Sequence, residues 1–230
     1  MAAHQSIGRI WTTAEGHMLR IGLQDKLEEI FARNMRACAN ASRVDEVILS
    51  TDSMEYWELA RRHVPSSKLT LDFRAPDEAG DTVKIFDYLK DKREKIFAGR
   101  SGAFLLTLPT VPLRRAHHID EAIELHEQSG RAVFSATNYG FPISFAFRME
   151  EAGAWVPVFP DCPMVTGNTR SQNQQEAYHP NGAIYVRAIA DLADNALKTL
   201  YTGAVPYMMS RTDSVDIDSE IDFKMAEALL

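Results

Sequence analysis

The sequence has 230 residues, of which 45% are hydrophobic, and its 25 Lys and Arg against 32 Asp and Glu leave a formal net charge of −7. This apolar fraction is typical of a globular protein and excludes a largely disordered chain. The acidic balance disfavours general nucleic-acid binding, because a phosphate backbone would be repelled, although a few local cations can still hold a small anion. One large domain spanning 1–230 is therefore expected.

Cysteine content and hydropathy indicate the compartment. The two cysteines, Cys38 and Cys162, are too few for a disulfide scaffold or a Cys-rich zinc site and are interpreted as reduced. No apolar stretch approaches the ~18–20 residues that a membrane span requires, and the polar start lacks the order of a signal peptide. We therefore expect a cytoplasmic protein that does not contact a membrane.

The first half of the chain alternates helices with buried strands. Apolar residues at three- and four-residue intervals predict a helix over 24–40, and the run Val44–Leu49 predicts a strand that ends in small polar residues before a second helix. Further along the chain, the pattern predicts a helix over 80–97, a strand at 103–108, a helix ending at Gly130 and a strand at 131–136. This alternation indicates the α/β class, with a mostly parallel sheet covered by helices on both faces.

The alternation lapses between residues 139 and 179, which we interpret as an insertion for pairing with a second copy. The stretches 145–149 and 155–159, separated by Glu150-Glu151-Ala152-Gly153, predict an antiparallel hairpin. After the insertion, the pattern predicts a strand at 182–186, a helix over 188–200, a strand at 204–209 and a closing helix over 219–230. In open α/β sheets the ligand lies beyond the carboxyl ends of the strands, so the segments that follow the strands are the candidate site.

The segment 214–219 carries the pattern most suggestive of chemistry. In an extended conformation Asp216 and Asp218 project to one face, while Val215 and Ile217 anchor the other. Two carboxylates side by side repel each other unless a cation lies between them, and oxygen ligands of this kind suit Mg²⁺ shared with substrate phosphates. The alternative is that Asp218 or Ser219 caps the final helix, and the two interpretations are compatible.

Two further features could hold an anionic or polyhydroxylated ligand. Arg74 and Arg114 are loop arginines, which can grip phosphate or carboxylate but are more often solvated surface charges. Residues 170–182 place a cation, amides and an aromatic ring in one loop, a mixture that suits a sugar acid but also fits a polar surface loop with a turn.

Five ordered motifs resemble the acylneuraminate cytidylyltransferase family, also called CMP-sialic acid synthetases. The resemblance spans residues 44–230, and Rossmann-like nucleotidyltransferases of this kind share the fold class expected above. Some of these residues resemble the pseudaminic acid branch and others the sialic and legionaminic branch, so the sugar stays undecided. The motifs are Asp45-Glu46-Val47-Ile48-Leu49-Ser50-Thr51-Asp52, Leu108-Pro109-Thr110-Val111-Pro112-Leu113-Arg114, Arg170-Ser171-Gln172, Asn181-Gly182-Ala183-Ile184-Tyr185 and Ser214-Val215-Asp216-Ile217-Asp218-Ser219-Glu220.

The resemblance implies transfer of a cytidylyl group from CTP to a nonulosonic acid, releasing pyrophosphate, with Mg²⁺ as cofactor and a homodimer as the assembly. It implies a metal site at Asp216 and Asp218, both counted as catalytic together with Arg20. Nucleotide contacts are implied for Gly16, Asp52, Arg74 and Thr82. Sugar contacts are implied for Arg170, Gln172, Tyr178 and Asn181.

The chain departs from the family pattern at its beginning. Family members hold the triphosphate with a loop of the form Ala-Arg-x-Gly-Ser-Lys-Gly, whereas this chain has Ile10-Trp11-Thr12-Thr13-Ala14-Glu15-Gly16 at the corresponding place, with Glu15 where a lysine is expected. Leu108 and Val111 also replace a glutamine and a serine. Two hypotheses follow: a diverged cytidylyltransferase in which Arg20 and Arg9 substitute for the lost cations, or a catalytically impaired protein that keeps the fold as a binding or partner subunit.

Overall fold

The computed structural model describes residues 6–11, 27–80, 83–97 and 99–230. The chain divides into two compact units, here called unit 1 (Met1–Ala136 and Pro180–Leu230) and unit 2 (Thr137–His179). The bounds of unit 2 lie within two residues of the insertion expected at about 139–179. Each unit is described separately.

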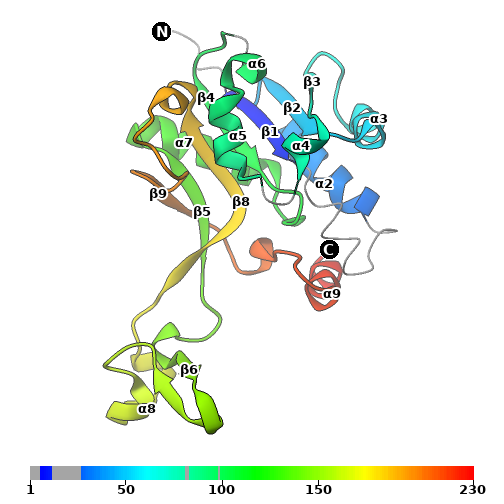
Figure 1. Ribbon diagram of the computed structural model, residues 1–230. Coiled ribbons are helices and arrows are strands. Elements are labelled where there is room, and N and C mark those ends of the chain that lie inside the picture. The colour runs from blue at the N-terminus through cyan, green and yellow to red at the C-terminus, as the bar shows by residue number, and fades with distance from the viewer. Residues whose placement is uncertain (1–5, 12–26, 81–82, 98) are drawn as a thin grey trace. The chain divides into compact units, whose positions relative to one another are not determined.

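A seven-stranded sheet in the order β3-β2-β1-β4-β8-β5-β9 forms the framework of unit 1 (Figure 1). Strand β1 pairs parallel with β2 and β4, β2 with β3, and β5 with β9, whereas β4 and β8 are antiparallel. The expected α/β class with a mostly parallel sheet is therefore confirmed. The strands are β1 Ser6–Trp11, β2 Glu46–Thr51, β3 Leu69–Phe73, β4 Ala103–Thr107, β5 Val133–Asn138, β8 Tyr178–Ala188 and β9 Val205–Met208.

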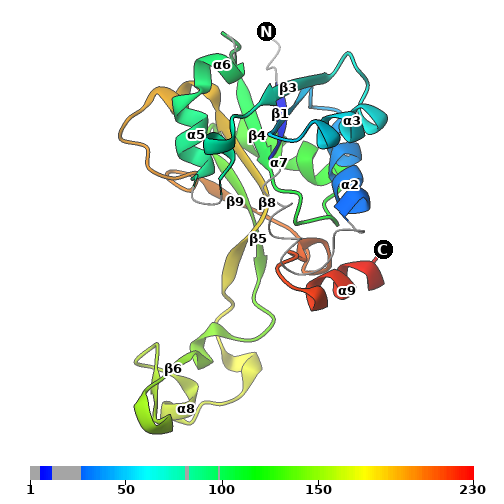
Figure 2. The ribbon, with the colours of Figure 1, turned by 45° about the vertical axis from the view of Figure 1, so that its right-hand side comes forward.

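Helices cover both faces of this sheet, and Figure 2 shows α5 and α6 on one side of the strands with α2 and α3 on the other. Val47 and Leu49 of β2 pack in a cluster with α2, α3 and α7, while Ile48 between them packs in a second cluster with α5 and α6. An uninterrupted apolar run is what a strand buried on both faces requires. The helices are α2 Leu27–Asn40, α3 Met54–His63, α4 Pro76–Ala79, α5 Ile85–Asp91, α6 Arg93–Phe97, α7 Ala116–Ser129 and α9 Glu220–Ala228.

Helix ends follow local chemistry where the sequence carries a clear signal. Helix α7 ends at Gly130, whose φ of 62° is left-handed and whose N–H donates to His126 O at 2.9 Å. None of the helices in the described part of the chain has the length and apolar character that crossing a bilayer requires.

Two of the predicted elements differ from the structure. The helix expected over 188–200 is wrong: a 3-10 turn, Ile189–Ala193, is followed by irregular chain. There Lys90 Nζ donates hydrogen bonds to the carbonyl oxygens of Asp194 and Leu197, at 2.7 and 2.9 Å. A side chain distant in the sequence therefore satisfies carbonyls that would accept from backbone N–H groups in a helix. The helix expected over 80–97 is divided into α5 and α6 at Lys92.

Unit 2 contains an antiparallel hairpin of β6 (Phe147–Met149) and β7 (Trp155–Pro157), which confirms the hairpin expected from the sequence. Its connection is a 3-10 turn in which Ala152 takes a positive φ of 60°. The short helix α8 (Pro163–Thr166) follows the hairpin. Large apolar side chains stay exposed on this unit, namely Phe141, Phe147, Met149, Trp155 and Val165.

Arg114 ties three distant segments of unit 1 together. Its Nη1 donates to Leu108 O at 3.2 Å and to Ala183 O at 2.7 Å, and its Nη2 donates to Asn34 Oδ1 of α2. Asn34 in turn donates to Pro109 O at 2.8 Å. The side chain is 2% exposed, and burial lowers the pKa of its guanidinium to about 10. The alternative of a solvated loop arginine is therefore wrong for Arg114, which holds the loop after β4 against α2 and β8.

We expect Arg114→Leu to lower the free energy of unfolding by about 3 kcal/mol, because the variant leaves an amide oxygen and two carbonyls buried without their donor. Urea denaturation measures the loss. Arg61→Leu is the control, because Arg61 is exposed on α3 and pairs with Glu58 at 3.1 Å. Its expected cost is below about 1 kcal/mol. Equal losses in the two variants would contradict the role of Arg114.

Candidate functional site

The carboxyl ends of β1, β2, β3 and β4 lie at one edge of the sheet, since these strands run parallel. Asp52 directly follows β2 and Arg74 directly follows β3, so the sheet brings these two predicted nucleotide contacts to the same edge. The Arg74 N–H donates to Thr51 O at 3.0 Å, which joins the two segments. Ligands of open α/β folds bind at such an edge.

Arg74 is a buried charge. Its side chain is 1% exposed, its Nη1 donates to Glu78 O at 3.1 Å, and its Cζ lies 5.7 Å from the centre of the Tyr88 ring. Burial lowers the pKa of the guanidinium, and the charge of Asp52 is the largest of the influences that oppose this. The contact of Arg74 with a nucleotide stays a prediction. The guanidinium that would make it is already bonded to Glu78 O and packed against Tyr88.

A polar network around Asp72 supports this edge and was not foreseen from the sequence. The Oδ2 of Asp72 accepts from Ser50 Oγ at 2.6 Å and from Tyr88 Oη at 3.0 Å, and its Oδ1 lies 3.2 Å from Lys95 Nζ. The carboxylate is 5% exposed and its charge acts on Arg74. The alternation of apolar and polar residues over Leu69–Phe73 is a signal for the strand, but it assigns Asp72 to the polar face, so the burial of Asp72 could not be predicted from it.

The segment that carries Asp216 and Asp218 is anchored by Ile217, as expected, and bends at Asp218. Ile217 is fully buried and packs with Val215, Ile30 and Leu113, and its N–H donates to Thr110 O at 2.9 Å. Asp216 is partly buried and Asp218 is exposed. The final helix begins beside them, and Asp222 accepts from Asp218 N at 3.2 Å and Ser219 Oγ at 2.6 Å. Asp222 rather than Asp218 or Ser219 therefore supplies the accepting side chain at this helix start.

Gly182 and Asn181 shape the wall that faces Asp216. Gly182 has a φ of +73°, and a Cβ there would lie 3.5 Å from Asp216 Oδ2 and 3.9 Å from Leu108 and Val111. A side chain at this position would be strained by the backbone conformation rather than by a clash, because 3.5 Å is an ordinary van der Waals contact. Leu108 and Val111, the departures from the family motif, thus give this wall an apolar surface.

Asn181 uses its amide within the protein. It is 3% exposed, its Nδ2 donates to Ser214 Oγ at 2.8 Å, and its Oδ1 accepts from Ala183 N at 3.2 Å. These bonds hold the start of β8 against the turn that leads to Asp216. The sugar contact implied for Asn181 stays a prediction.

The donor set at Asp216 and Asp218 fits Mg²⁺ in chemical type. Magnesium in proteins is held by one or two carboxylates and keeps its other positions for water and substrate phosphates. Among the described residues, no group of three or more His, Cys, Asp or Glu is placed to hold a metal ion, so any site here is of this two-carboxylate kind. The charge of Asp216 also extends to Tyr185, whose phenol pKa is raised mainly by burial, then by Tyr201, and least by Asp216.

The other sugar contacts belong to unit 2. Arg170, Gln172 and Tyr178 are all exposed, and the Tyr178 Oη donates to Glu176 Oε2 at 2.6 Å. A polar cavity of about 140 Å³ in the same unit is lined by residues that include Tyr139, Ser171 and Gln174. The structure thus places three of the four predicted sugar contacts in one unit and Asn181 in the other.

Three predicted site residues, Gly16, Arg20 and Thr82, lie outside the described residues. The same holds for Glu15 and for most of the loop that departs from the family pattern. Their implied contacts with the nucleotide stay predictions.

Curated proteins similar to this chain are enzymes that make CMP-activated acidic sugars. The chain is 26% identical over 208 residues to the CMP-N,N'-diacetyllegionaminic acid synthase of Legionella pneumophila, covering 87% of this chain and 84% of that protein. It is 24% identical over 205 residues to the pseudaminic acid cytidylyltransferase of Campylobacter jejuni, covering 87% and 84%. It is 26% identical to the N-acylneuraminate cytidylyltransferase of Escherichia coli, where it covers 86% of this chain and 45% of that longer protein.

Solved structures agree on the fold. The structure of CMP:2-keto-3-deoxy-manno-octonic acid synthetase complexed with CTP matches with a TM-score of 0.60 at 10% identity, covering 98% of each chain. No protein-family model matches the sequence. The curated relatives confirm the resemblance drawn from the five motifs, and the solved structure confirms the fold.

The Asp72 network leads to a stability prediction. We expect Tyr88→Phe to lower the free energy of unfolding by about 1–2 kcal/mol, because a buried carboxylate oxygen loses one of its donors. Urea denaturation measures the loss, with Tyr178→Phe as the matched control, since Tyr178 is 52% exposed. The control should cost less than about 0.5 kcal/mol. A loss in Tyr88→Phe no larger than in the control would show that the network does not stabilise this edge.

Proposed function

We propose that this chain, a relative of the acylneuraminate cytidylyltransferases, transfers a cytidylyl group from CTP to the anomeric hydroxyl of a nonulosonic acid and releases pyrophosphate. The proposal rests on the position of the Asp216 carboxylate. The segment anchored by Ile217 holds this carboxylate near Gly182, beside the end of β4. The names of the curated relatives support the reaction class.

The residues present suit this reaction because nucleotidyl transfer depends on positioning and on neutralising charge rather than on a protein nucleophile. Asp216 and Asp218 would hold Mg²⁺, which when bound neutralises charge on the triphosphate. Arg74 supplies a fixed positive charge at the ends of β2 and β3, where Asp52 lies beside it. Arg170, Gln172 and Tyr178 of unit 2 offer the cation, amide and hydroxyl that would recognise an acidic sugar.

The second candidate function is a binding or partner subunit that keeps the fold without catalysis. The sequence favours it at Glu15, because a carboxylate beside a triphosphate is repulsive. The structure favours it at Leu108 and Val111, which place apolar groups next to Gly182 and Asp216.

We propose a cytoplasmic location, where CTP is made. Two free, buried cysteines, Cys38 and Cys162, support this location, because an oxidising compartment favours disulfide formation.

Titration calorimetry with CTP separates the two functions. We expect CTP to bind at about micromolar affinity when Mg²⁺ is present and far more weakly in EDTA, since the carboxylates and the phosphates share the ion. Absence of binding at about millimolar CTP with Mg²⁺ would favour the partner subunit.

Asp218→Asn tests the metal assignment. Because Asp218 is exposed, we expect this variant to have the same urea midpoint of unfolding as the wild type. We expect it to lose the release of pyrophosphate from CTP in the presence of a nonulosonic acid. Asp213→Asn, a carboxylate on the turn just before the segment, is the control and should keep turnover. Unchanged turnover in Asp218→Asn would refute the metal assignment.

We propose a homodimer formed through unit 2, because its exposed apolar side chains are the kind that a protein interface covers. Light scattering should give twice the chain mass of 25.8 kDa. Met149→Glu, at a side chain that is 66% exposed, should shift the population to monomer, whereas Ile221→Glu on α9, at 61% exposed, should not. A monomeric mass for the wild-type chain would contradict the dimer.

A further inference from the structure

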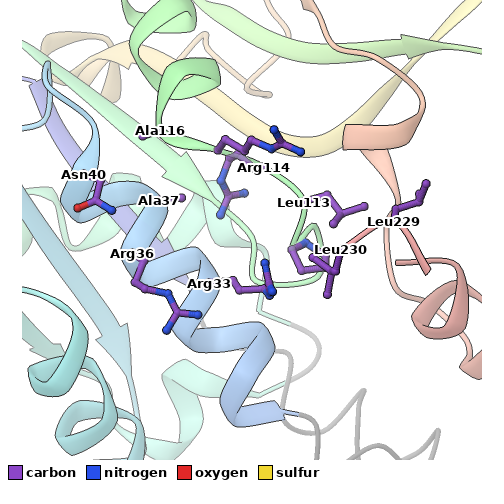
Figure 3. A pocket seen from close by; sticks show the side chains of 11 residues that line it. Arg33, Arg36, Ala37, Asn40, Leu113, Arg114, Ala116, Leu229 and Leu230 are labelled. Atoms are coloured by element: carbon purple, nitrogen blue, oxygen red, sulfur yellow. The ribbon is translucent and has the colours of Figure 1, made fainter. Parts of the chain in front are cut away.

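A cavity of about 430 Å³ lies in unit 1 between helix α2, the loop after β4 and the start of α7 (Figure 3). Its polar lining comes from Arg33, Arg36 and Asn40 of α2 and from Arg114 and Arg115 of the loop. The rest of the lining is apolar, namely Ala37, Pro112, Leu113, Ala116, Leu229 and Leu230. None of these is among the residues implied in catalysis. Gly182 and its neighbours Asp216, Leu108 and Val111 are not among the residues that line this cavity.

Positive charge is concentrated around this cavity. Four arginines line it, and no acidic side chain is among the described residues that do so. Glu29 of α2, which does not line the cavity, forms ion pairs with Arg33, at 3.0 Å, and with Arg36, at 3.1 Å. Asp213 is 3.9 Å from Arg115 and also lies near His118. Among the described residues, the acidic side chains of Glu29 and Asp213 therefore face four guanidinium groups, in a chain whose net charge is −7, and the last residue, Leu230, also lines the cavity.

Arg114 contributes a second, independent feature. Its Nε is buried and has no hydrogen-bond partner within the described part of the chain, although Nη1 and Nη2 are bonded. The side chain is 2% exposed, lines the cavity, and is directed toward α2 in Figure 3. Within the described part of the chain no carboxylate is among the charges that act on it, and the charge of Cys38 opposes the lowering of its pKa to about 10. An anion in the cavity would supply the missing compensation.

The start of α7 adds backbone donors. This helix has 14 residues and no acidic residue in its first turn, and His118 Nδ1 accepts from the N–H of Arg115, the residue before the helix, at 3.1 Å. The positive end of such a helix attracts anions, and its first N–H groups can bond them.

We propose that this cavity is a binding site for a small phosphate-bearing molecule, separate from the candidate catalytic edge. The three terminal oxygens of a phosphate can accept from several guanidinium groups and helix amides at once, whereas a carboxylate offers two oxygens. Arg33 and Arg36 are three residues apart on α2 and so present their donors to the same ligand.

The test is titration calorimetry of the full chain with inorganic pyrophosphate in EDTA at about 50 mM salt. EDTA removes Mg²⁺, so a site that needs Mg²⁺ does not bind the probe, and the low salt concentration keeps the screening of charges weak. We expect one equivalent to bind. The double variant Arg36→Gln and Arg115→Gln should weaken binding at least about tenfold, because charge-assisted hydrogen bonds are lost. The control, Arg61→Gln with Arg93→Gln, removes two similarly exposed and paired arginines elsewhere and should stay within about twofold.

A second arm with CMP identifies the source of the phosphate. CMP binding that is lost in the same double variant indicates a phosphate ester, and binding of pyrophosphate alone indicates a free inorganic anion. Asp218→Asn should bind as the wild type does, which separates this site from the proposed metal site. No binding of either probe at about 10 mM, or equal binding in the double variant and its control, would overturn the proposal.

Discussion

The buried guanidinium of Arg114 is the constraint on which the rest of unit 1 depends. It bonds to a carbonyl at the end of β4, to a carbonyl of β8 and to Asn34 of α2, and these three segments are far apart in the sequence. Burying a charge is costly unless it is hydrogen-bonded, so the partners of Nη1 and Nη2 must be in place together. The loop after β4 therefore has one arrangement relative to the sheet.

That loop separates two surfaces with different chemistry. On one side Val111 faces Gly182 and Asp216, where an apolar wall meets a carboxylate. On the other side Arg114 and Arg115 line a cationic cavity. The same short segment therefore contributes to both walls, and Arg114 joins it to Ala183 of β8.

The candidate catalytic edge combines retained and altered chemistry. The segment around Asp216 is anchored by Ile217 and lies beside Gly182, and a buried network around Asp72 supports the strand that leads to Arg74. Leu108 and Val111 give the wall beside Gly182 an apolar surface.

The sequence by itself determined the α/β class, the hairpin of unit 2 and the anchored alternation around Asp216, because hydrophobic period and turn residues are local signals. It could not show that Arg114 and Arg74 are buried, that Asp72 is bonded to Tyr88, or that 188–200 is not a helix. Each of these depends on partners distant in the chain: a loop arginine looks solvated until Asn34 and Ala183 are placed around it. Only the tertiary structure decided them, since burial and hydrogen-bond partners are properties of packing rather than of neighbouring residues.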